Sequence, residues 1–192
     1  MSVKRLFIAI PVNAELPLLD VLDVLKKELQ DENINWVSPR NLHFTLQFLG
    51  DTLPDSIPLL HSKLKELTAG FSQASGAIRG IDTFGQKGNP RIIFARLEGM
   101  PSMADMARAI SDTMEPLGYV PDYRDFKSHL TLGRIRFLRN RQRLAKIVEM
   151  FREKEFQTMT AHEIILYESI LQPQGPVYKP LFTYTLRTNQ GN

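Results

Sequence analysis

Two short stretches of the chain repeat one pattern of histidine and threonine. NLHFTLQFLG contains His43 and Thr45. SHLTLGR, further along, contains His129 and Thr131. An imidazole has an unperturbed pKa near ~6.5, so it can take or give a proton around neutral pH, and a threonine hydroxyl can donate a hydrogen bond to an oxyanion. The repeated pattern therefore holds the groups needed for acid–base chemistry on a bound anion.

The spacing within each stretch suits a β-strand, whose side chains point to alternate faces with a period of two residues. The polar face of the first stretch would hold His43, Thr45 and Gln47. Its apolar face would hold Phe44, Leu46 and Phe48. The histidine and threonine of the second stretch share a face in the same way. We expect the apolar faces to pack under helices and the polar faces to meet across a groove.

Two imidazoles beside one anion suit phosphodiester chemistry, in which attack and departure occur in line on opposite sides of phosphorus. One imidazole takes a proton from the attacking oxygen while the other gives a proton to the leaving oxygen. No acidic cluster accompanies the histidines, so the sequence favours a mechanism without a metal or another cofactor. A single histidine on a strand is more often structural, but the recurrence of both His and Thr in different surroundings favours a functional pair.

The segments around the two stretches recur in one order: strand, amphipathic helix, His-x-Thr-x strand, second helix and closing strand. The predicted strands cover residues 5–12, 42–49, 76–85, 91–99, 129–135 and 162–172, with a further strand over 177–187. The predicted helices cover residues 14–30, 57–70, 102–118 and 141–151. The two histidines lie 86 positions apart, and the offset stays near this value for the other segments. The order of elements therefore predicts an internal duplication.

The duplication predicts an α+β fold in which residues 1–192 form a single bilobal domain. The pseudo-symmetric halves would cover approximately residues 1–87 and 88–192, with a mostly antiparallel sheet in each lobe. Helices would cover the outer face of each sheet, and an active-site cleft would lie between the sheets. GQKGNP, over residues 85–90, is the strongest turn signal in the chain, so we predict that it links the two lobes.

The composition is that of an ordinary globular protein, with 43% apolar and 23% charged residues. A formal net charge of +3 permits an anionic ligand without requiring one. No apolar run approaches the ~20 residues needed to cross a bilayer, and a proline interrupts the N-terminal run LFIAIPV. The absence of cysteine fits a reducing compartment. We therefore expect a cytoplasmic monomer without a membrane partner.

Several other residues could contact a nucleic acid. RIRFLRNRQRLAK, over residues 134–146, holds six basic residues and no acidic one, and is either a solvated helix start or a basic rim for an RNA backbone. Most aromatic residues belong to cores, but a few could stack on a base: Trp36, Phe48, Phe84, Phe126 and Tyr167. Two histidines lack a threonine two positions later, and we expect His61 to be a surface residue and His162 to be structural.

The chain resembles the two-histidine phosphoesterase superfamily, in particular its LigT-like branch of RNA 2′,3′-cyclic phosphodiesterases, also called 2′-5′ RNA ligases. The likeness runs nearly end to end, through RLFIAIPV, WVSPRNLHFTLQFLG, FKSHLTLGR and ESILQPQGPVYKPLFTYTL. It implies a bilobal fold and a metal-independent opening of a terminal 2′,3′-cyclic phosphate to a 2′-phosphomonoester. RNA with such an end would be the partner, and 2′-5′ RNA joining in the reverse direction would be a related activity.

The resemblance also implies roles for individual residues. His43 would be the acid that protonates the departing 3′ oxygen, and His129 would be the base that activates water. Thr45 and Thr131 would hold the phosphate. A symmetric pair of histidines does not by itself reveal which imidazole starts protonated.

Arg134 occupies a family position from which it could contact the phosphate. Simple alternation would turn it away from the face of His129, unless Gly133 introduces a bulge into the strand. Ser128 stands where many relatives have a proline, which changes the entry to the strand but not the chemistry.

Two other functions fit the same residues. The first keeps the fold and changes the substrate to a small cyclic nucleotide such as ADP-ribose 1″,2″-cyclic phosphate. The second is a nucleotide- or RNA-binding module of the same fold with little turnover. Metal-independent hydrolysis, and its loss when His43 or His129 is replaced, would separate these functions.

Overall fold

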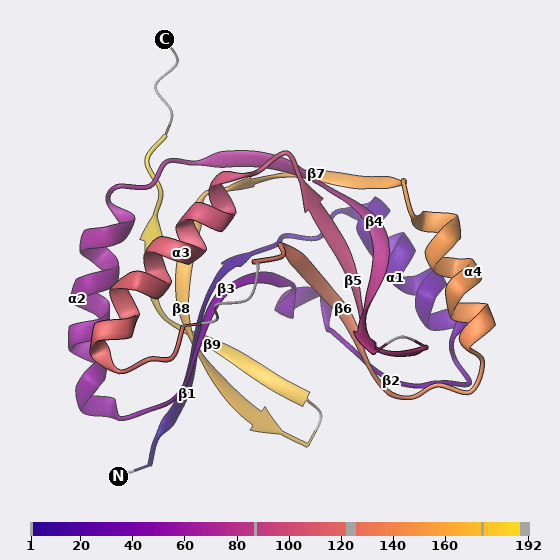
Figure 1. The fold of residues 1–192 in the computed structure, drawn as a ribbon, viewed down its shortest axis with the longest axis horizontal. Helices are drawn as coiled ribbons and strands as arrows, with labels where there is room; N and C mark the ends of the chain where they lie inside the picture. The colour runs from indigo at the N-terminus through magenta and orange to yellow at the C-terminus, as the bar shows by residue number, and fades with distance from the viewer. Residues whose placement is uncertain (1, 87, 122–125, 174, 189–192) are drawn as a thin grey trace.

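Two antiparallel sheets occupy the middle of the molecule, and four α-helices lie at its two ends (Figure 1). The computed structural model describes residues 2–86, 88–121, 126–173 and 175–188. The α+β architecture with antiparallel sheets confirms the predicted fold class. None of the helices in the described ranges is long and apolar enough to span a membrane.

The two sheets have matching strand orders. The four-stranded sheet runs, in spatial order, β3 (His43–Thr52), β1 (Lys4–Pro11), β8 (Glu163–Gln172) and β9 (Gly175–Thr185). The five-stranded sheet runs β2 (Asn33–Trp36), β6 (His129–Phe137), β5 (Asn89–Glu98), β4 (Ala74–Gln86) and β7 (Glu155–Ala161). Apart from the additional edge strand β2, the two histidine strands β3 and β6 therefore occupy equivalent places.

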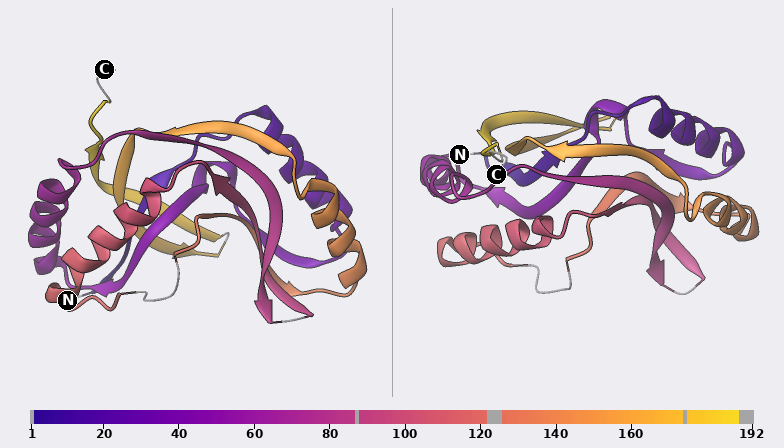
Figure 2. Two further views of the ribbon diagram at one scale, coloured as in Figure 1. Left: turned by 45° about the horizontal axis from the view of Figure 1, so that its top comes forward. Right: turned by 90° about the horizontal axis from the view of Figure 1, so that it is seen from above.

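The helices form two pairs, one for each sheet. They are α1 (Leu16–Glu28), α2 (Ile57–Thr68), α3 (Ser102–Met114) and α4 (Arg141–Phe151), with short 3-10 turns at Pro39–Asn41, Pro54–Ser56 and Glu115–Leu117. Helices α2 and α3 contact each other and pack against β9 and β3, whereas α1 and α4 pack against β7 and β4. The views in Figure 2 show the same two pairs at opposite ends of the molecule.

Apolar residues at helical spacing explain how the helices attach to the sheets. Helix α1 buries Leu18, Val21, Leu22 and Leu25 on one face. Full burial of such a side chain contributes roughly 1.5–3 kcal/mol. At the start of α4, the Asn140 side chain accepts a hydrogen bond from the backbone N–H of Arg143, which satisfies one free donor of the first turn.

Each sheet combines strands from both halves of the sequence. Strands β8 and β9 join β1 and β3, while β2 and β4 join β5, β6 and β7. The helices cross in the same way, because α1 packs on the five-stranded sheet and α3 on the four-stranded one. The two sheets therefore do not coincide with residues 1–87 and 88–192.

The prediction that residues 85–90 link two lobes was wrong. Gly85 pairs with Pro90 and Gln86 with Asn89, so this segment closes the hairpin between β4 and β5 inside one sheet. Lys87, at its tip, lies outside the described residues. A strong turn signal marks the end of a strand but does not say whether the next strand pairs with it.

Candidate active site

The two histidines of the repeated pattern have the same local geometry. His43 is the first residue of β3, and its Nδ1 lies 2.7 Å from the carbonyl oxygen of Asn41. His129 is the first residue of β6, and its Nδ1 lies 2.7 Å from the carbonyl oxygen of Lys127. A carbonyl oxygen only accepts, so each Nδ1 carries a hydrogen and donates it. Both Nε2 atoms are thereby left available for proton transfer.

The fold brings these two histidines into one electrostatic environment. Strands β3 and β6 belong to different sheets, but their residues contact each other. Burial lowers the pKa of His43 below its usual value, while its hydrogen bond to the Asn41 carbonyl raises it. The charges of Arg134 and His129, both on β6, lower the pKa of His43 further. The protonation of one imidazole therefore depends on groups carried by the opposite sheet.

Aromatic rings pack around His43. The Phe7 ring lies 5.0 Å from the imidazole, and the Tyr178 ring meets it edge-on at 5.2 Å. The Tyr167 ring stacks on the Phe7 ring, with the two ring centres 5.1 Å apart. These rings come from β1, β9 and β8, and they supply the burial that disfavours the charged imidazole.

The rings around His129 are phenyl groups. Phe84 lies 5.0 Å and Phe94 lies 5.8 Å from the imidazole, both edge-on, and the two phenyl rings stack on each other at 4.0 Å. Phe94 on β5 is the counterpart of Phe7 on β1, because each strand lies next to its histidine strand.

The threonines follow the predicted alternation. Thr45 and Thr131 are half-buried, like the histidines two positions before them. The apolar residues between and after them are buried: Phe44, Leu46, Leu130 and Leu132. Each strand therefore presents a histidine and a threonine on one face and apolar side chains on the other.

A bulge in β3 overturns the prediction for the next two residues. Ala9 pairs with Thr45 and Ile8 with Gln47, so Leu46 is an extra residue without a partner on β1. Beyond it, Gln47 is only 5% exposed and Phe48 is 65% exposed. The expected placement of Gln47 with the histidine, and of Phe48 on the apolar face, was wrong because the bulge reverses the alternation.

An equivalent bulge in β6 brings Arg134 to the histidine face. Phe94 pairs with Thr131 and Ile93 with Gly133, so Leu132 is the extra residue. Arg134 is exposed, and its charge acts on both His43 and Tyr178 of the other sheet. Arg134 was expected to reach the face of His129 only if the strand contained a bulge, and β6 contains one.

Position 133 requires a glycine for a reason other than the bulge, whose extra residue is Leu132. A Cβ there would lie 2.9 Å from the indole of Trp36 and 3.0 Å from Ile34, both on the neighbouring strand β2. Only glycine allows β2 to place Trp36 over this point of β6. Trp36 packs against the core, so its predicted role as a base-stacking residue has no support in its position.

The other aromatic candidates separate into two groups. Phe126 packs against the core, as Trp36 does. Phe84 and Tyr167 lie in the ring clusters of the two histidines, and Phe48 is exposed beyond the first motif. Sequence reasoning missed Tyr178, which contacts His43 from β9, because nothing in a single sequence indicates which distant strand supplies a neighbouring ring.

The two remaining histidines lie away from these strands. His61 is half-buried between α2 and β9: its ring stacks on Phe182 at 3.9 Å, and its Nδ1 is 3.1 Å from the hydroxyl of Tyr184. The prediction of a surface residue was wrong for His61, since the face of the helix that carries it packs on a strand. His162 is exposed, and its backbone carbonyl accepts a hydrogen bond from the N–H of Leu186.

The basic run over residues 134–146 is partly structural. Arg143 donates to the carbonyl of Glu28 at 3.1 Å and pairs with Asp31 at 3.5 Å. Within the described ranges, no ion pair involves Arg134, Arg136 or Arg141, and all three are exposed. Together with Arg139 and Lys146, which are also exposed and in no ion pair with the described residues, these side chains are the part of the run that could meet an anionic ligand.

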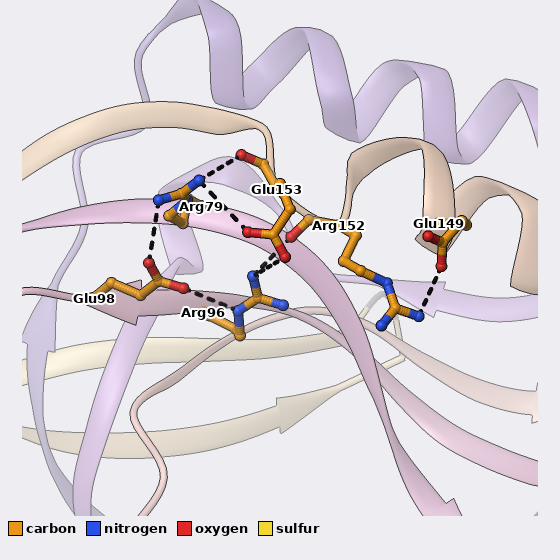
Figure 3. A network of polar contacts seen from close by, with 6 residues as sticks. All are labelled: Arg79, Arg96, Glu98, Glu149, Arg152 and Glu153. Atoms are coloured by element: carbon orange, nitrogen blue, oxygen red, sulfur yellow. Dashed lines mark hydrogen bonds and ion pairs between the residues drawn. The ribbon is translucent and has the colours of Figure 1, made fainter.

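A network of arginines and glutamates lies beside the second histidine strand (Figure 3). Arg96 on β5 pairs in register with His129, and its guanidinium donates to the carbonyl of Arg152 at 2.7 Å. Arg79 on β4 donates to the carbonyl of Glu153 at 2.9 Å, and Glu98 pairs with both arginines at 3.3 and 3.5 Å. Cations at the end of α4 complement the helix dipole and hold the helix to the strands next to His129.

No group of three or more His, Asp or Glu side chains that could hold a metal ion comes together in the described part of the chain.

A cavity of ≈ 320 Å³ opens beside His43. Asn41, at its rim, donates from its side-chain amide to the carbonyl of Pro176 at 2.9 Å, while its own carbonyl holds His43. One residue thus joins the first histidine to the β8–β9 hairpin.

Comparison with known proteins identifies the family. The family described as LigT like Phosphoesterase matches residues 8–94 and 98–178, most of the chain. The RNA 2′,3′-cyclic phosphodiesterase of Archaeoglobus fulgidus is 31% identical over 177 residues, which cover 92% of this chain and 97% of the relative. The protein of the same name from Methanothermobacter thermautotrophicus is 30% identical over 166 residues, with coverages of 86% and 89%. The crystal structure of TT0787 of Thermus thermophilus has a TM-score of 0.78 and 25% identity, covering 97% of this chain and 100% of that one. These findings confirm the predicted family: the chain belongs to the LigT-like phosphoesterases.

Proposed function

We propose that this phosphoesterase hydrolyses the 2′,3′-cyclic phosphate at the end of an RNA to a 2′-phosphomonoester, with His43 and His129 as acid and base. The observation that carries the proposal is the matched pair of imidazoles, each held through Nδ1 by a backbone carbonyl and each with an Nε2 that makes no hydrogen bond to the residues that the structure describes. The names of the relatives from Archaeoglobus fulgidus and Methanothermobacter thermautotrophicus support the choice of substrate.

The reaction needs two proton transfers. His129 Nε2 takes a proton from water as the water oxygen forms its bond to phosphorus. The bond between phosphorus and the 3′ oxygen breaks, and His43 Nε2–H gives a proton to that oxygen. The product has a 2′-phosphomonoester and a free 3′ hydroxyl. A 5′ hydroxyl in place of water would form a 2′-5′ linkage by the same steps.

Three side chains would stabilise the phosphate during this reaction. The hydroxyls of Thr45 and Thr131 share the faces of the two histidines and can donate to the non-bridging oxygens. Arg134, exposed beyond the bulge of β6, can neutralise part of the charge that develops on them. The bound anion would also raise the pKa of His43, against the effect of burial, and so favour its protonated form.

A direct test uses RNA oligonucleotides with a 2′,3′-cyclic end and ADP-ribose 1″,2″-cyclic phosphate, both assayed in EDTA. We expect hydrolysis of the RNA ends with a kcat/KM well above that for the nucleotide. The variants His43→Ala and His129→Ala should each lose about 10²–10⁴-fold in kcat, while the exposed His162→Ala serves as a matched control.

The same assays can reject the proposal. Preference for the cyclic ADP-ribose derivative would leave the chemistry in place and change the substrate. If the wild-type protein turns over no cyclic phosphate in EDTA but binds RNA, and both histidine variants bind equally well, the protein is a binding module instead of an enzyme of this type.

A further inference from the structure

Four polar side chains are buried in the described part of the chain, and one of them joins segments that are far apart in sequence. Thr52 and Thr68 each bond to backbone carbonyls a few residues earlier, and Gln47 has no partner among the described residues. Gln157, on β7, is 6% exposed and makes two hydrogen bonds to the segment between β1 and α1. A buried amide whose partners lie on a distant segment fixes the place of that segment.

The two hydrogen bonds use both ends of the Gln157 amide. Its Oε1 accepts from the backbone N–H of Glu15 at 2.8 Å, and its Nε2 donates to the backbone carbonyl of Asn13 at 3.0 Å. Glu15 is the N-cap of α1, so its N–H has no partner inside the helix. Gln157 therefore supplies partners for backbone groups that the connection between strand and helix leaves unpaired.

Residues 12–15 pass from one sheet to the other. They begin after β1, in the four-stranded sheet, and end at α1, which packs against β7 of the five-stranded sheet. The N–H of Val12 donates to the carbonyl of Leu42, the residue before the first histidine, at 3.0 Å. One end of this segment is thus attached to the strand of the first histidine. Through Gln157, the other end is attached to the sheet that carries the second histidine.

The proposed reaction depends on how the two sheets are placed. Each sheet supplies one imidazole, and both imidazoles must reach the same phosphate at the same time. The sheets contact each other directly through β3 and β6. A contact along one pair of strands leaves the sheets able to turn about that line, and a second attachment away from it removes this freedom. A misplacement of about 1 Å can cost on the order of 10²-fold in rate, so the second attachment matters for catalysis.

We infer that Gln157 is a positioning residue, whose amide holds the sheet of His43 in place relative to the sheet of His129. This inference rests on the proposed function and deepens it, because it names a residue outside the site on which the rate depends. Gln157 acts through the backbone of residues 12–15 and transfers no proton itself.

The two buried glutamines offer a matched pair of variants. Gln157→Met keeps the size of the side chain and removes both hydrogen bonds to residues 12–15. Gln47→Met removes an amide that has no partner among the described residues. The two glutamines are 6% and 5% exposed, so these variants differ in the lost hydrogen bonds and not in the burial of the new side chain.

A pair of proline variants breaks the same attachment from its other side. Glu15 is exposed and has a φ of −91°, near the value that proline imposes, so Glu15→Pro mainly removes the N–H that donates to Gln157. Leu16→Pro is the control, since the N–H of this exposed first helical residue makes no hydrogen bond to any residue that the structure describes. The proline pair leaves Gln157 in place, so it tests the inference even if Gln157→Met does not fold.

The first measurement is kcat for an RNA oligonucleotide with a 2′,3′-cyclic end, under conditions in which urea denaturation shows each variant to be fully folded. We expect kcat to fall by about tenfold or more in Gln157→Met and Glu15→Pro. It should stay within about twofold of wild type in Gln47→Met and Leu16→Pro. An amide with a purely structural role would lower the urea midpoint and leave kcat of the folded protein unchanged, and that result would overturn the inference.

A distance measurement separates this inference from the proposed function. The chain has no cysteine, so Asp51→Cys/Phe137→Cys places one spin label on each histidine strand, at exposed positions near the ends away from the histidines. Double electron–electron resonance should give a broader distribution of distances between the labels when Gln157→Met or Glu15→Pro is added, but not when either control is added.

If the wild-type protein turns over no cyclic phosphate, the proposed function fails, yet the distance distributions still decide whether Gln157 holds the two sheets. Distributions as narrow as that of the labelled wild type in both Gln157→Met and Glu15→Pro would overturn the inference, whatever the values of kcat.

Discussion

Phe48 and Arg134 occupy equivalent positions on the two histidine strands. Each follows its histidine by five residues, lies beyond a bulge at an extra leucine, and is exposed. The repeat thus places an aromatic ring on one side of the site and a cation on the other. Because these positions are related by the duplication and differ in chemistry, the two sides of the site can contact different parts of one substrate.

Burial is the main cause of the lowered pKa of His43, and the charge of Arg134 should shift further the pH at which the enzyme loses activity. If His43 is the acid, kcat/KM falls as pH rises through its pKa. The cationic Arg134 lowers that pKa, so Arg134→Gln should raise it and move the alkaline fall in kcat/KM to higher pH. A pH profile of kcat/KM, with Arg136→Gln as an exposed control on the same strand, measures the shift. A fall that stays at its wild-type pH would contradict the assigned role.

Burial of His43 should make the folded protein less stable in acid. The folded-state pKa is lower than the unfolded value near ~6.5, so the unfolded state binds more protons in this range. Stability is then fully present above the unfolded pKa and is lost as pH falls through the folded pKa. Urea denaturation of wild type and His43→Gln between pH 5 and 8 should show a smaller acid-side loss in the variant. Parallel curves for the two proteins would refute this account.

A side chain at Gly133 should destabilise the protein through its clash with Trp36. We expect Gly133→Ala to cost about 1–3 kcal/mol, because the rigid indole cannot move aside easily. In a Trp36→Ala background the same change should cost much less, and a double-mutant cycle of unfolding free energies measures this coupling. Additive effects of the two changes would mean that the indole is not the obstacle.

The buried amide of Gln47 should reduce stability. Neither its Oε1 nor its Nε2 has a hydrogen-bond partner among the described residues, and such a group costs roughly 1–3 kcal/mol. Gln47→Met, of similar shape, should therefore raise the midpoint of urea denaturation at unchanged kcat. Phe44→Met offers a comparison, since it replaces a buried ring and should lower the midpoint. A loss of stability in Gln47→Met would show that the amide is satisfied in solution.

The exposed arginines at the end of β6 and the start of α4 should affect longer RNA more than a cyclic mononucleotide. Arg136→Gln/Arg141→Gln should raise KM for an oligonucleotide with a cyclic end and reduce its salt dependence, with a slope change of about 0.7 per lost phosphate contact. Adenosine 2′,3′-cyclic phosphate should be hydrolysed as by wild type. Arg108→Gln, exposed on α3, is the matched control. If the salt dependence of KM for the oligonucleotide is unchanged in the double variant, the basic run does not contact RNA and is only the solvent-exposed start of a helix.

Local patterns predicted most elements, because they depend on residues close in sequence. The apolar stripe of α1 and the alternation around His43 and His129 are examples of such patterns. Strands β2 and β7 were not predicted; the four residues of β2, two of them asparagines, give little strand signal. The turn at residues 85–90 was recognised, but its place in the fold was not, because pairing between strands is not a local property.

In the candidate site, too, features that depend on residues close in sequence could be predicted, and features that depend on strand pairing could not. The histidines and threonines could be selected from the repeated pattern alone. The positions of Gln47 and Phe48 could not, because a bulge arises from the pairing of two strands and reverses every face beyond it. Tyr178 contacts His43, and Asn41 contacts Pro176, through the packing of distant segments, and a single sequence contains no record of these contacts.

The exchange of strands between the halves bears on how the chain could be cut. With the chain opened at the β4–β5 hairpin, the N-terminal piece keeps β2 and β4, whose neighbours are all on the other piece, and the C-terminal piece keeps β7, whose neighbour is β4. Neither piece should fold alone, but co-expressed they should reassemble into an active, nicked protein. By the same logic, an ancestor with only one repeat would have been an intertwined homodimer, with one catalytic pocket between its two subunits.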